Sequence, residues 1–423
     1  MPQTMMTSPE QGPALNIRPG WALPSAAYHD PAIYRKELTD IFHSGWLFAA
    51  TSAQLANPGD TLTWTVGSES VVLARTTSGA VAAMHNTCRH RGCRITPDGT
   101  AQGRALVCPY HNWAYRLDGS FAGAPHMGDA LTAELRSELG LVPVPVSEFA
   151  GLIFVCFSQS PPPIERAHDA ITAHVGRYRA QATQITSVHH YEVDANWKVL
   201  VENNRECYHC SPNHPEFCLS NYELGMPGDS RTNQRYQEVV TRQRHRWSEQ
   251  GLPVDDVSFP DGDFFRVARL PLKDGYLTES MSGQLVGPLL GDLASPDVGS
   301  IRIVTLPNSW IHVNADYVMA TRLTPIDENT THVDVTFQVR DGARAGIDYE
   351  IGDVEAVWVA TSEQDWALCE KTHAGIRSAG YRPGPLSPVT EGSVVDFHIW
   401  WAHRLGIDAV GQSATTIGNE AVS

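Results

Sequence analysis

Two short segments of this chain each offer one thiol and one imidazole, and they constrain its fold more than any other feature. Cys88 and His90 are followed, after seventeen residues, by Cys108 and His111. Structural zinc sites usually draw two ligands of one kind from each loop, whereas one cysteine and one histidine per loop suit a two-iron cluster with both cysteines on one iron. The spacing therefore predicts a [2Fe-2S] cluster on these four residues, and a Cys2His2 zinc ribbon is the alternative.

The residues around this site predict a compact antiparallel β domain. Short strand-like runs are separated by turn signals such as Ser78-Gly79 and Asp98-Gly99, a pattern typical of consecutive short strands. The predicted strands cover 61–66, 70–75, 81–85, 104–108 and 113–117. A helix is expected ahead of them at 32–43, because Pro31 is tolerated in a first helical turn.

The chain is long enough for two domains, and its pattern changes after residue 160. With 423 residues it exceeds the size at which a single core usually stops growing. The three consecutive prolines at 161–163 make a stiff linker. Beyond them, longer helices mix with strands at 301–306 and 310–314, an α+β pattern that ends with a helix at 393–405. We expect an N-terminal segment with a helix at 1–45, the cluster domain at 46–160 and a larger domain at 161–423.

A second group of metal-binding side chains lies on a predicted helix over 196–209. An apolar stripe supports this helix, and Pro212 prevents its continuation. Glu202, Glu206 and His209 recur at spacings of four and three on another face, so we expect them to point the same way.

His214 lies five residues after His209. Five residues do not return to the same helical face, so the two histidines converge on one metal only because the helix ends between them. The spacing also differs from that of the zinc-protease helix, whose histidines are four apart. It therefore favours a separate mononuclear metal site.

A third ligand should be a carboxylate if these histidines belong to a 2-His-1-carboxylate triad, which leaves open positions on Fe(II) for oxygen. Asp365 falls on the same three-four helical stripe as Val354, Trp358 and Thr361. An unpaired carboxylate on a buried face is costly, and a metal ion would satisfy it. On helical pattern alone, a salt-bridged or helix-capping Asp365 is the alternative.

The segments that carry both ligand sets resemble those of the Rieske non-haem iron ring-hydroxylating oxygenases, α subunit. The resemblance runs from about Ala27 to Leu405, and its most specific motifs are Cys88-Arg-His-Arg-Gly92, Cys108-Pro-Tyr-His-Asn-Trp113, Glu206-Cys-Tyr-His209 with His214, and Gln364-Asp-Trp-Ala-Leu-Cys-Glu370. It implies an α+β fold: a small antiparallel Rieske domain and a larger helix-grip catalytic domain, with a mixed or antiparallel sheet and long helices.

By this resemblance the chain is an oxidoreductase, a Rieske mono- or dioxygenase with a [2Fe-2S] cluster and a mononuclear Fe(II). The resemblance implies that the Fe(II) is bound by His209, His214 and Asp365. Glu206 would be the catalytic acidic bridge that links this iron to the cluster of a neighbouring subunit. That role implies a homotrimer or a multiple of trimers.

One departure from a related branch concerns the cluster loops. Respiratory Rieske proteins carry an extra cysteine in each loop, and the two form a disulfide. Here Cys93 stands at the first of these places, but Tyr110 occupies the second. No such bridge can form, so we expect Cys93 to be a buried small hydrophobe.

The chain needs an electron donor, because O2 activation at Fe(II) requires electrons delivered one at a time. The sequence shows neither a convincing Gly-rich dinucleotide fingerprint nor the four-cysteine run of plant-type ferredoxins. A separate flavin and iron–sulfur reductase is therefore expected to supply electrons from NAD(P)H.

Segments at 270–272, 375–380 and 384–388 look most similar to the family branch that acts on glycine betaine, stachydrine and related methylated amines. This resemblance implies hydroxylation of an N-methyl group, followed by release of formaldehyde. Aromatic faces would bind a quaternary ammonium through cation–π attraction, and the candidates are Tyr208, Phe217, Phe264, Phe265 and Trp310. The alternatives are hydroxylation or dihydroxylation of an aromatic acid or ring, and a plain Rieske electron carrier.

Composition excludes some partners. A net charge of -16 disfavours nucleic acid and anionic membranes, and residues 1–20 show no signal or transit peptide, so we expect a cytoplasmic protein. The eight cysteines are better explained as metal ligands and buried thiols than as disulfides. Cys207 and Cys210 have the spacing of a zinc or redox pair, but packing thiols are the simpler account.

Overall fold

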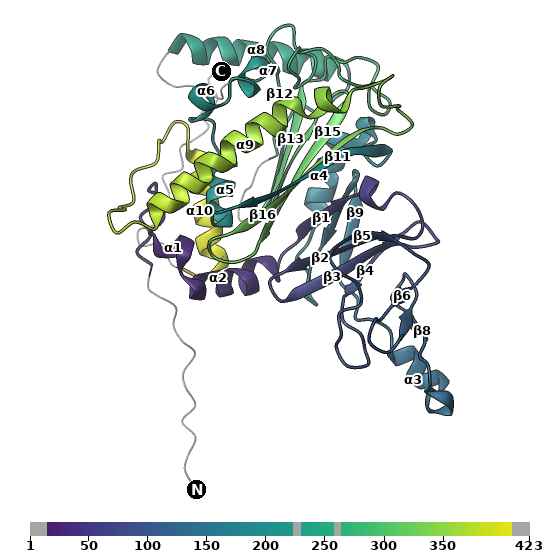
Figure 1. Cartoon of the computed structure of the whole chain (residues 1–423). Helices are drawn as coiled ribbons and strands as arrows, with labels where there is room; N and C mark the ends of the chain where they lie inside the picture. Colours follow the sequence, from purple (N-terminus) through teal and green to yellow (C-terminus); the bar gives the residue numbers. More distant parts are fainter. Residues whose placement is uncertain (1–14, 223–229, 258–263, 408–423) are drawn as a thin grey trace.

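The computed structural model describes residues 15–222, 230–257 and 264–407, and it has the predicted α+β architecture (Figure 1). The helical elements are α1 (Ala26–His29), α2 (Pro31–Glu37), η1 (Leu38–Phe42), η2 (Ser52–Leu55), η3 (Gly128–Ala130), α3 (Ala133–Glu138), α4 (Glu165–Val175), η4 (Gly176–Tyr178), α5 (Trp197–Asn204), α6 (Cys210–Asn213), α7 (Phe217–Ser220), α8 (Ser230–Glu249), α9 (Ile351–Ile376) and α10 (Gly392–Arg404). The strands are β1 (Leu47–Thr51), β2 (Asp60–Val66), β3 (Glu69–Arg75), β4 (Val81–His85), β5 (Gly99–Gln102), β6 (Leu106–Val107), β7 (Ala114–Tyr115), β8 (Phe121–Gly123), β9 (Val146–Phe149), β10 (Leu152–Val155), β11 (Thr183–Val193), β12 (Phe265–Leu270), β13 (Ser300–Thr305), β14 (Ser309–Val313), β15 (Tyr317–Pro325) and β16 (Thr331–Arg340).

The N-terminal third forms small antiparallel sheets, as predicted. One has the strand order β4-β3-β2-β5, a second β6-β7-β8 and a third β1-β10-β9. All five predicted strands are present, although β6 and β7 are shorter than expected. The predicted N-terminal helix is also confirmed: Pro31 opens α2, the Asp30 side chain accepts a hydrogen bond from the Ala32 amide, and η1 continues the helix to Phe42.

The larger part is built on one antiparallel sheet with the strand order β11-β16-β15-β14-β13-β12. Helix α9 crosses this sheet, with α5 packed beside it, and α4 packs against β12 and β13 (Figure 1). The sheet resolves the open choice between a mixed and an antiparallel arrangement in favour of the latter. The predicted strands at 301–306 and 310–314 are β13 and β14, and the predicted last helix is α10.

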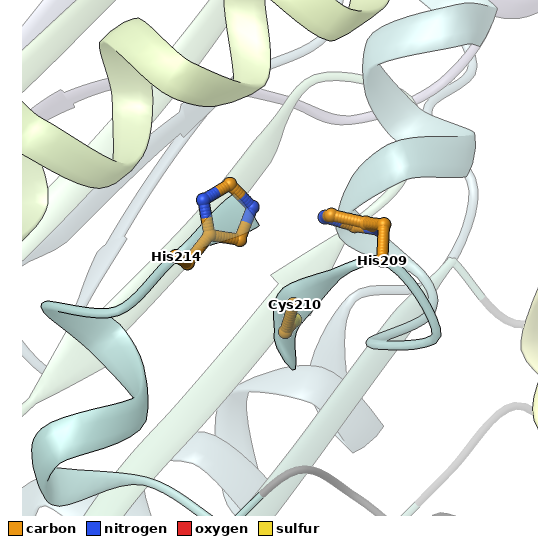
Figure 2. A group of neighbouring side chains, drawn as sticks. All are labelled: His209, Cys210 and His214. Atoms are coloured by element: carbon orange, nitrogen blue, oxygen red, sulfur yellow. The ribbon is translucent and has the colours of Figure 1, made fainter. Parts of the chain in front are cut away.

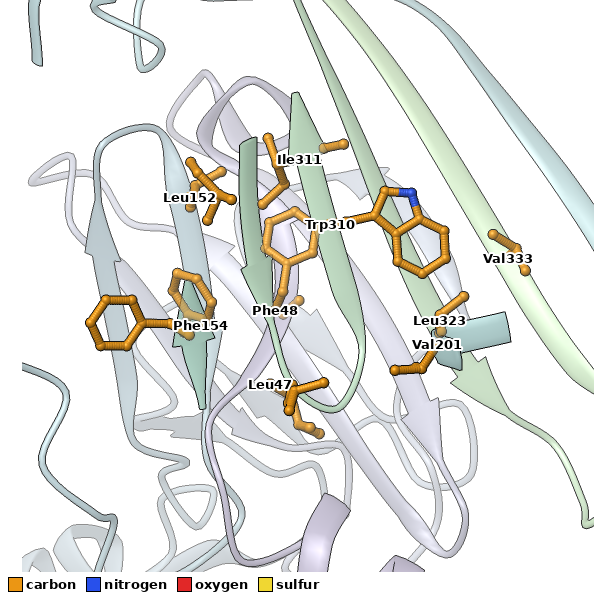
Figure 3. Packing of buried hydrophobic residues seen from close by; sticks show 14 of the residues in the cluster. Leu47, Phe48, Leu152, Phe154, Val201, Trp310, Ile311, Leu323 and Val333 are labelled. Atoms are coloured by element: carbon orange, nitrogen blue, oxygen red, sulfur yellow. The ribbon is translucent and has the colours of Figure 1, made fainter. Parts of the chain in front are cut away.

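One hydrophobic core joins two of the small sheets, β1-β10-β9 and β4-β3-β2-β5, to the large one. Leu47 and Phe48 on β1 pack with Leu152 and Phe154 on β10 against residues of β14 and β15 (Figure 3). The Asn308 side chain bonds to both backbone groups of Phe48, at 3.0 and 2.9 Å. A smaller separate core, from Val72 to Leu141, lies under the two Cys/His loops. The two Cys/His loops are therefore supported by a hydrophobic core of their own. The domain boundary expected at 160–161 stays a prediction.

The helix predicted over 196–209 is confirmed as far as Asn204, and the prediction is wrong for residues 205–209. Helix α5 begins with Asn196 as its N-cap but ends at Asn204, and α6 starts at Cys210. Between them the Glu206 carboxylate accepts hydrogen bonds from the Tyr208 amide and from His209 Nδ1. Such side-chain to backbone bonds compete with helical hydrogen bonds. As a result Glu202 and Glu206 do not share one face.

No helix in the described ranges is long and apolar enough to cross a membrane.

The N-terminal helices are fastened to the large part by a buried ion pair. The Glu37 carboxylate accepts hydrogen bonds from Lys198 Nζ at 2.5 Å, from Trp197 Nε1 at 2.8 Å and from Trp401 Nε1 at 2.7 Å. The side chains of Glu37 and Lys198 are both 0% exposed. Burial lowers the pKa of Lys198, and Glu37 counteracts this shift.

Replacing Glu37 by alanine should leave the Lys198 ammonium buried without its carboxylate. We expect a loss of about 3–5 kcal/mol in the free energy of unfolding, the usual cost of breaking a buried pair on one side. The control is Lys36→Ala, which breaks the exposed Lys36–Asp40 pair next to it and should cost less than about 1 kcal/mol. Urea denaturation followed by far-UV circular dichroism measures both, and equal losses would contradict this assignment.

Candidate active site and cluster site

The two Cys/His loops have the same local geometry. In the first, the Gly92 amide donates to the Cys88 carbonyl at 2.9 Å, and in the second, the Asn112 amide donates to the Cys108 carbonyl at 3.0 Å. Gly92 has φ +76° and Asn112 has φ +56°. Glycine adopts this left-handed conformation freely and asparagine tolerates it. Each loop thus turns back at the fourth residue after its cysteine.

The loops bring the four predicted cluster ligands together. Cys88 and Cys108 are 3% and 1% exposed, whereas His90 is exposed and His111 is half-buried, with their ring centroids 4.6 Å apart. Burial raises the pKa of Cys108, but the Tyr110 amide and the Cys88 thiol outweigh this and hold the pKa below its ordinary value. Two buried sulfurs, one favouring the thiolate, and two outer imidazoles fit a [2Fe-2S] cluster with cysteines on the inner iron.

Cys93 differs from the expectation of a buried small hydrophobe. It is half-exposed, its thiol donates to the Arg94 carbonyl at 3.2 Å, and it also contacts Cys108. The Cys93 carbonyl accepts a hydrogen bond from the Cys88 amide at 2.9 Å, so this residue closes the first loop, and its side chain packs against the small core without being fully buried. Tyr110, at the place of the second extra cysteine, is 57% exposed.

The second candidate site unites three side chains from two distant segments. His209 Nε2 lies 3.2 Å and His214 Nε2 2.9 Å from the same oxygen, Asp365 Oδ1. Helix α9 carries Asp365, while the two histidines flank the short α6. Figure 2 shows both imidazole rings directed into the same space, and their centroids are 5.0 Å apart.

The distances between these side-chain atoms fit a metal site. Metal–ligand bonds of about 2.1 Å in a facial arrangement put neighbouring ligand atoms about 3 Å apart, close to the distances of the two histidine nitrogens from Asp365 Oδ1, 3.2 and 2.9 Å. His214 Nε2 is buried, and its one close polar neighbour in the described ranges is Asp365 Oδ1. Burial lowers the pKa of His209, but Asp365 and Glu206 outweigh it and raise the pKa to about 9. A positive charge is therefore favoured between these carboxylates.

Further polar side chains hold the candidate metal ligands in place. The Nδ1 atoms of the two histidines face Glu206 at 2.5 Å and Gln364 at 2.8 Å, which leaves both Nε2 atoms for a metal. Asn203 Nδ2 donates to Asp365 Oδ1 at 3.0 Å and lies 3.3 Å from His209 Nε2. Asn203 and Gln364 were missed as functional residues in the sequence, although Gln364 stands next to Asp365 and Asn203 is a polar residue at the end of an apolar helix.

Glu202 serves a different purpose from Glu206. It accepts hydrogen bonds from the Tyr28 hydroxyl at 2.7 Å and from His398 Nε2 at 2.8 Å. The residue therefore connects α5 to the N-terminal helix α1 and to α10.

Cys210 also lies close to His209 and His214, with the three potential ligand atoms within 4.8 Å of one another (Figure 2). Its sulfur, however, is joined to Cys207 in a disulfide, with 5.0 Å between the Cα atoms. The expectation that these two cysteines are packing thiols is wrong in this structure. The turn that ends α5 brings them within bonding distance, so Cys210 offers no thiolate to a metal.

The metal-site residues open onto a cavity of about 350 Å³, a volume suited to a small ligand. Its floor is formed by two rows of directly opposed strand residues: Arg266, Val304 and Trp310, then Ala268, Arg302 and His312. Among the five aromatic candidates only Phe217 and Trp310 line it, and Trp358 and Tyr236 join them. Tyr208 is instead 58% exposed, and Phe264 and Phe265 are buried outside the cavity lining.

Comparisons with known proteins agree with this two-site arrangement. Residues 45–144 match the model of the Rieske [2Fe-2S] domain, and residues 182–407 match that of the ring hydroxylating alpha subunit, catalytic domain. A glycine betaine monooxygenase oxygenase subunit from Chromohalobacter salexigens is 35% identical over 387 residues, which are 91% of this chain and 86% of the relative. The subunit of the same name from Pseudomonas aeruginosa is 34% identical over 405 residues, 95% of this chain and 93% of the relative.

The fold is shared with a solved structure. The crystal structure of a quaternary ammonium Rieske monooxygenase in complex with an inhibitor superposes with a TM-score of 0.69 at 22% identity, covering 91% of this chain and 96% of that one.

Proposed function

Because the chain belongs to the family of Rieske-type ring-hydroxylating oxygenase α subunits, we propose that it hydroxylates an N-methyl group of a methylated or quaternary amine. Its Rieske domain binds a [2Fe-2S] cluster and its catalytic domain a mononuclear iron. The catalytic-domain match over 182–407 makes it an oxygenase and not a plain electron carrier. The observation that supports a methylated amine as the substrate is the similarity, over nearly the whole chain, to two glycine betaine monooxygenase oxygenase subunits.

We assign the cofactors to the residues predicted from the sequence. Cys88, Cys108 and the two nearby histidines hold the cluster, and a facial triad holds the iron: His209, His214 and Asp365. The iron, when bound, supplies activation of O2. Glu206, whose side chain is 13% exposed and bonded to His209, is the proposed acidic bridge to a neighbouring subunit's cluster.

The proposal extends to partners and place. An oxygenase subunit needs a separate reductase, which we expect to contain flavin and an iron–sulfur centre and to oxidise NAD(P)H. We expect trimers or multiples of trimers, since the Glu206 role requires a second subunit. We also propose that the protein is cytoplasmic. We propose that its cluster domain spans residues 46–160, between an N-terminal segment at 1–45 and a catalytic domain at 161–423.

The proposed reaction consumes one O2, two electrons and two protons for each N-methyl group. One oxygen atom enters the methyl C–H bond and the other leaves as water. The resulting N-hydroxymethyl group then breaks its C–N bond, releasing formaldehyde, the demethylated amine and, from a quaternary substrate, one proton. Phe217, Trp310 and Trp358 line the cavity, where their faces attract an ammonium group and exclude water.

The test is anaerobic reconstitution with Fe(II) and a generic reductase, followed by exposure to O2 with methylated amines or with aromatic acids. We expect formaldehyde from a methylated amine in amounts that match the O2 consumed. Hydroxylated ring products alone would refute the demethylation and leave the oxygenase assignment intact.

A further inference from the structure

The cavity beside the iron ligands carries more positive charge than a site for a simple cation requires. We propose that Arg266 anchors a carboxylate of the substrate, so that the substrate is a zwitterion: a methylated amine that also bears a carboxylate. This inference rests on the proposed function and deepens it.

Several arginines line the cavity with unused hydrogen-bond donors. The Nε atoms of Arg244, Arg266 and Arg302 are buried, and none has a hydrogen-bond acceptor within the described ranges. Buried donors without acceptors are unfavourable. A ligand rich in acceptor oxygens would satisfy them, and an ammonium group would not.

Two of these arginines already have a carboxylate beside them. Arg302 Nη2 lies 2.5 Å from Asn221 Oδ1 and 3.5 Å from Glu279 Oε1. Glu279 is buried, and although burial raises its pKa, His312 and Arg302 outweigh this and lower the pKa to about 2. Arg244 pairs with Asp256 at 3.2 Å. The charges of both arginines are therefore compensated within the protein.

Arg266 differs from these two. In the described part of the chain it has no hydrogen bond and no ion pair within 4.0 Å, although it is half-buried. The carboxylate of Asp396 on α10 influences it electrostatically, but that residue is exposed and lies beyond ion-pair distance. Its planar guanidinium is thus available for a substrate carboxylate, which it can bind through two parallel hydrogen bonds.

The position of Arg266 suits a ligand with two opposite charges. In the sheet Arg266 opposes Val304, and Val304 opposes Trp310 on its other side. Neighbouring strands lie about 4.8 Å apart, so the backbones of Arg266 and Trp310 are about 10 Å apart on the same face. The aromatic faces can hold the ammonium end while the long Arg266 side chain reaches the carboxylate end. The N-methyl groups then lie on the side of the iron ligands.

The experiment compares two ligands that differ only at the carboxylate: glycine betaine, and glycine betaine amide, in which a neutral carboxamide replaces the carboxylate and the ammonium group is kept. In the holoenzyme, Arg266→Met should raise both the anaerobic calorimetric Kd and the KM for glycine betaine by roughly 10- to 100-fold, the effect of losing a charge-assisted hydrogen bond. The Kd and the KM of this variant for the amide should change by less than about twofold. Arg266→Lys should recover part of the loss, since it keeps the charge but not the paired geometry.

The matched control is Arg244→Met, which removes an arginine from the same cavity whose charge is already compensated. It should leave the ratio of the two KM values within about twofold of the wild-type ratio. If Arg266→Met weakens both ligands equally, or if the wild-type enzyme demethylates the amide as well as the betaine, the carboxylate anchor is refuted while the demethylase proposal stands.

A third ligand separates failure of the inference from failure of the proposed function. Benzoate carries a carboxylate without an ammonium group. If the wild-type enzyme forms no formaldehyde from any methylated amine but hydroxylates benzoate in an Arg266-dependent manner, the anchor stands, whereas the zwitterionic substrate and the demethylase function are both refuted.

Discussion

Replacing His209 by alanine should lower O2-dependent product formation by at least about 1000-fold, because the iron site then loses one of its three ligands. His209 contacts three side chains, with Glu206 at Nδ1 and both Asp365 and Asn203 at Nε2. The variant should contain about one iron fewer per chain, measured by elemental analysis. Its visible absorption should be unchanged, because the cluster ligands lie in a different part of the fold.

The control for this prediction is His332→Ala. His332 is an exposed histidine on β16 that pairs with Glu192 at 3.0 Å, outside both candidate sites, and its loss should alter neither iron content nor turnover. Retention of the mononuclear iron in His209→Ala would disprove the ligand assignment. Loss of the visible spectrum together with the iron would instead indicate general unfolding. A plain electron carrier would keep its full activity in this variant.

The sequence predicted both ligand sets because each depends on local order. The two cluster loops differ by one residue in spacing, yet both turn at the fourth residue after the cysteine, where glycine and asparagine allow φ above zero. Helical periodicity made Asp365 a candidate, since α9 runs unbroken for 26 residues, and the family resemblance of the segment around it favoured the ligand role over a salt-bridged or capping aspartate. These signals are contained within single elements.

The end of α5 was mispredicted for a physical reason. The apolar stripe of Trp197, Leu200 and Val201 is buried as expected, and helical propensity alone would allow the helix to continue. The Glu206 carboxylate instead accepts hydrogen bonds from the Tyr208 backbone amide and from the His209 side chain. Periodicity does not report this competition, because it depends on where the side chain finds its partners in the folded protein.

The register of β12, β13 and β14 could not be predicted from the sequence. Each strand alternates its side chains between two faces, but which residues stand opposite one another depends on pairing across the sheet. Arg266 and Trp310 lie in one row only because Val304 opposes both. The same holds for Asn203 and Gln364, whose partners come from distant segments. The charge pattern of the cavity is therefore visible only in the structure.

The second large effect is expected from Cys108→Ser, which removes a buried cysteine proposed as a cluster ligand. The variant should lose the visible absorption and the acid-labile sulfide of the cluster, since serine is a poor substitute for a thiolate ligand of iron. Turnover should fall by at least about 1000-fold, because electrons no longer reach the catalytic iron. The mononuclear iron should remain, since His209, His214 and Asp365 are unchanged and are not carried by the small core under the cluster loops.

Cys93→Ser is the matched control, because Cys93 lies in the first cluster loop and its thiol contacts Cys108. Its side chain is half-exposed and donates to the Arg94 carbonyl, a bond that a serine hydroxyl can also make. This variant should therefore keep the cluster spectrum and most of the activity. If it loses the cluster as completely as Cys108→Ser does, Cys93 is a ligand and the assignment of one thiol and one imidazole to each loop is incorrect. If purified wild-type protein contains zinc and no labile sulfide, the cluster itself is excluded, and with it the delivery of electrons to the second site.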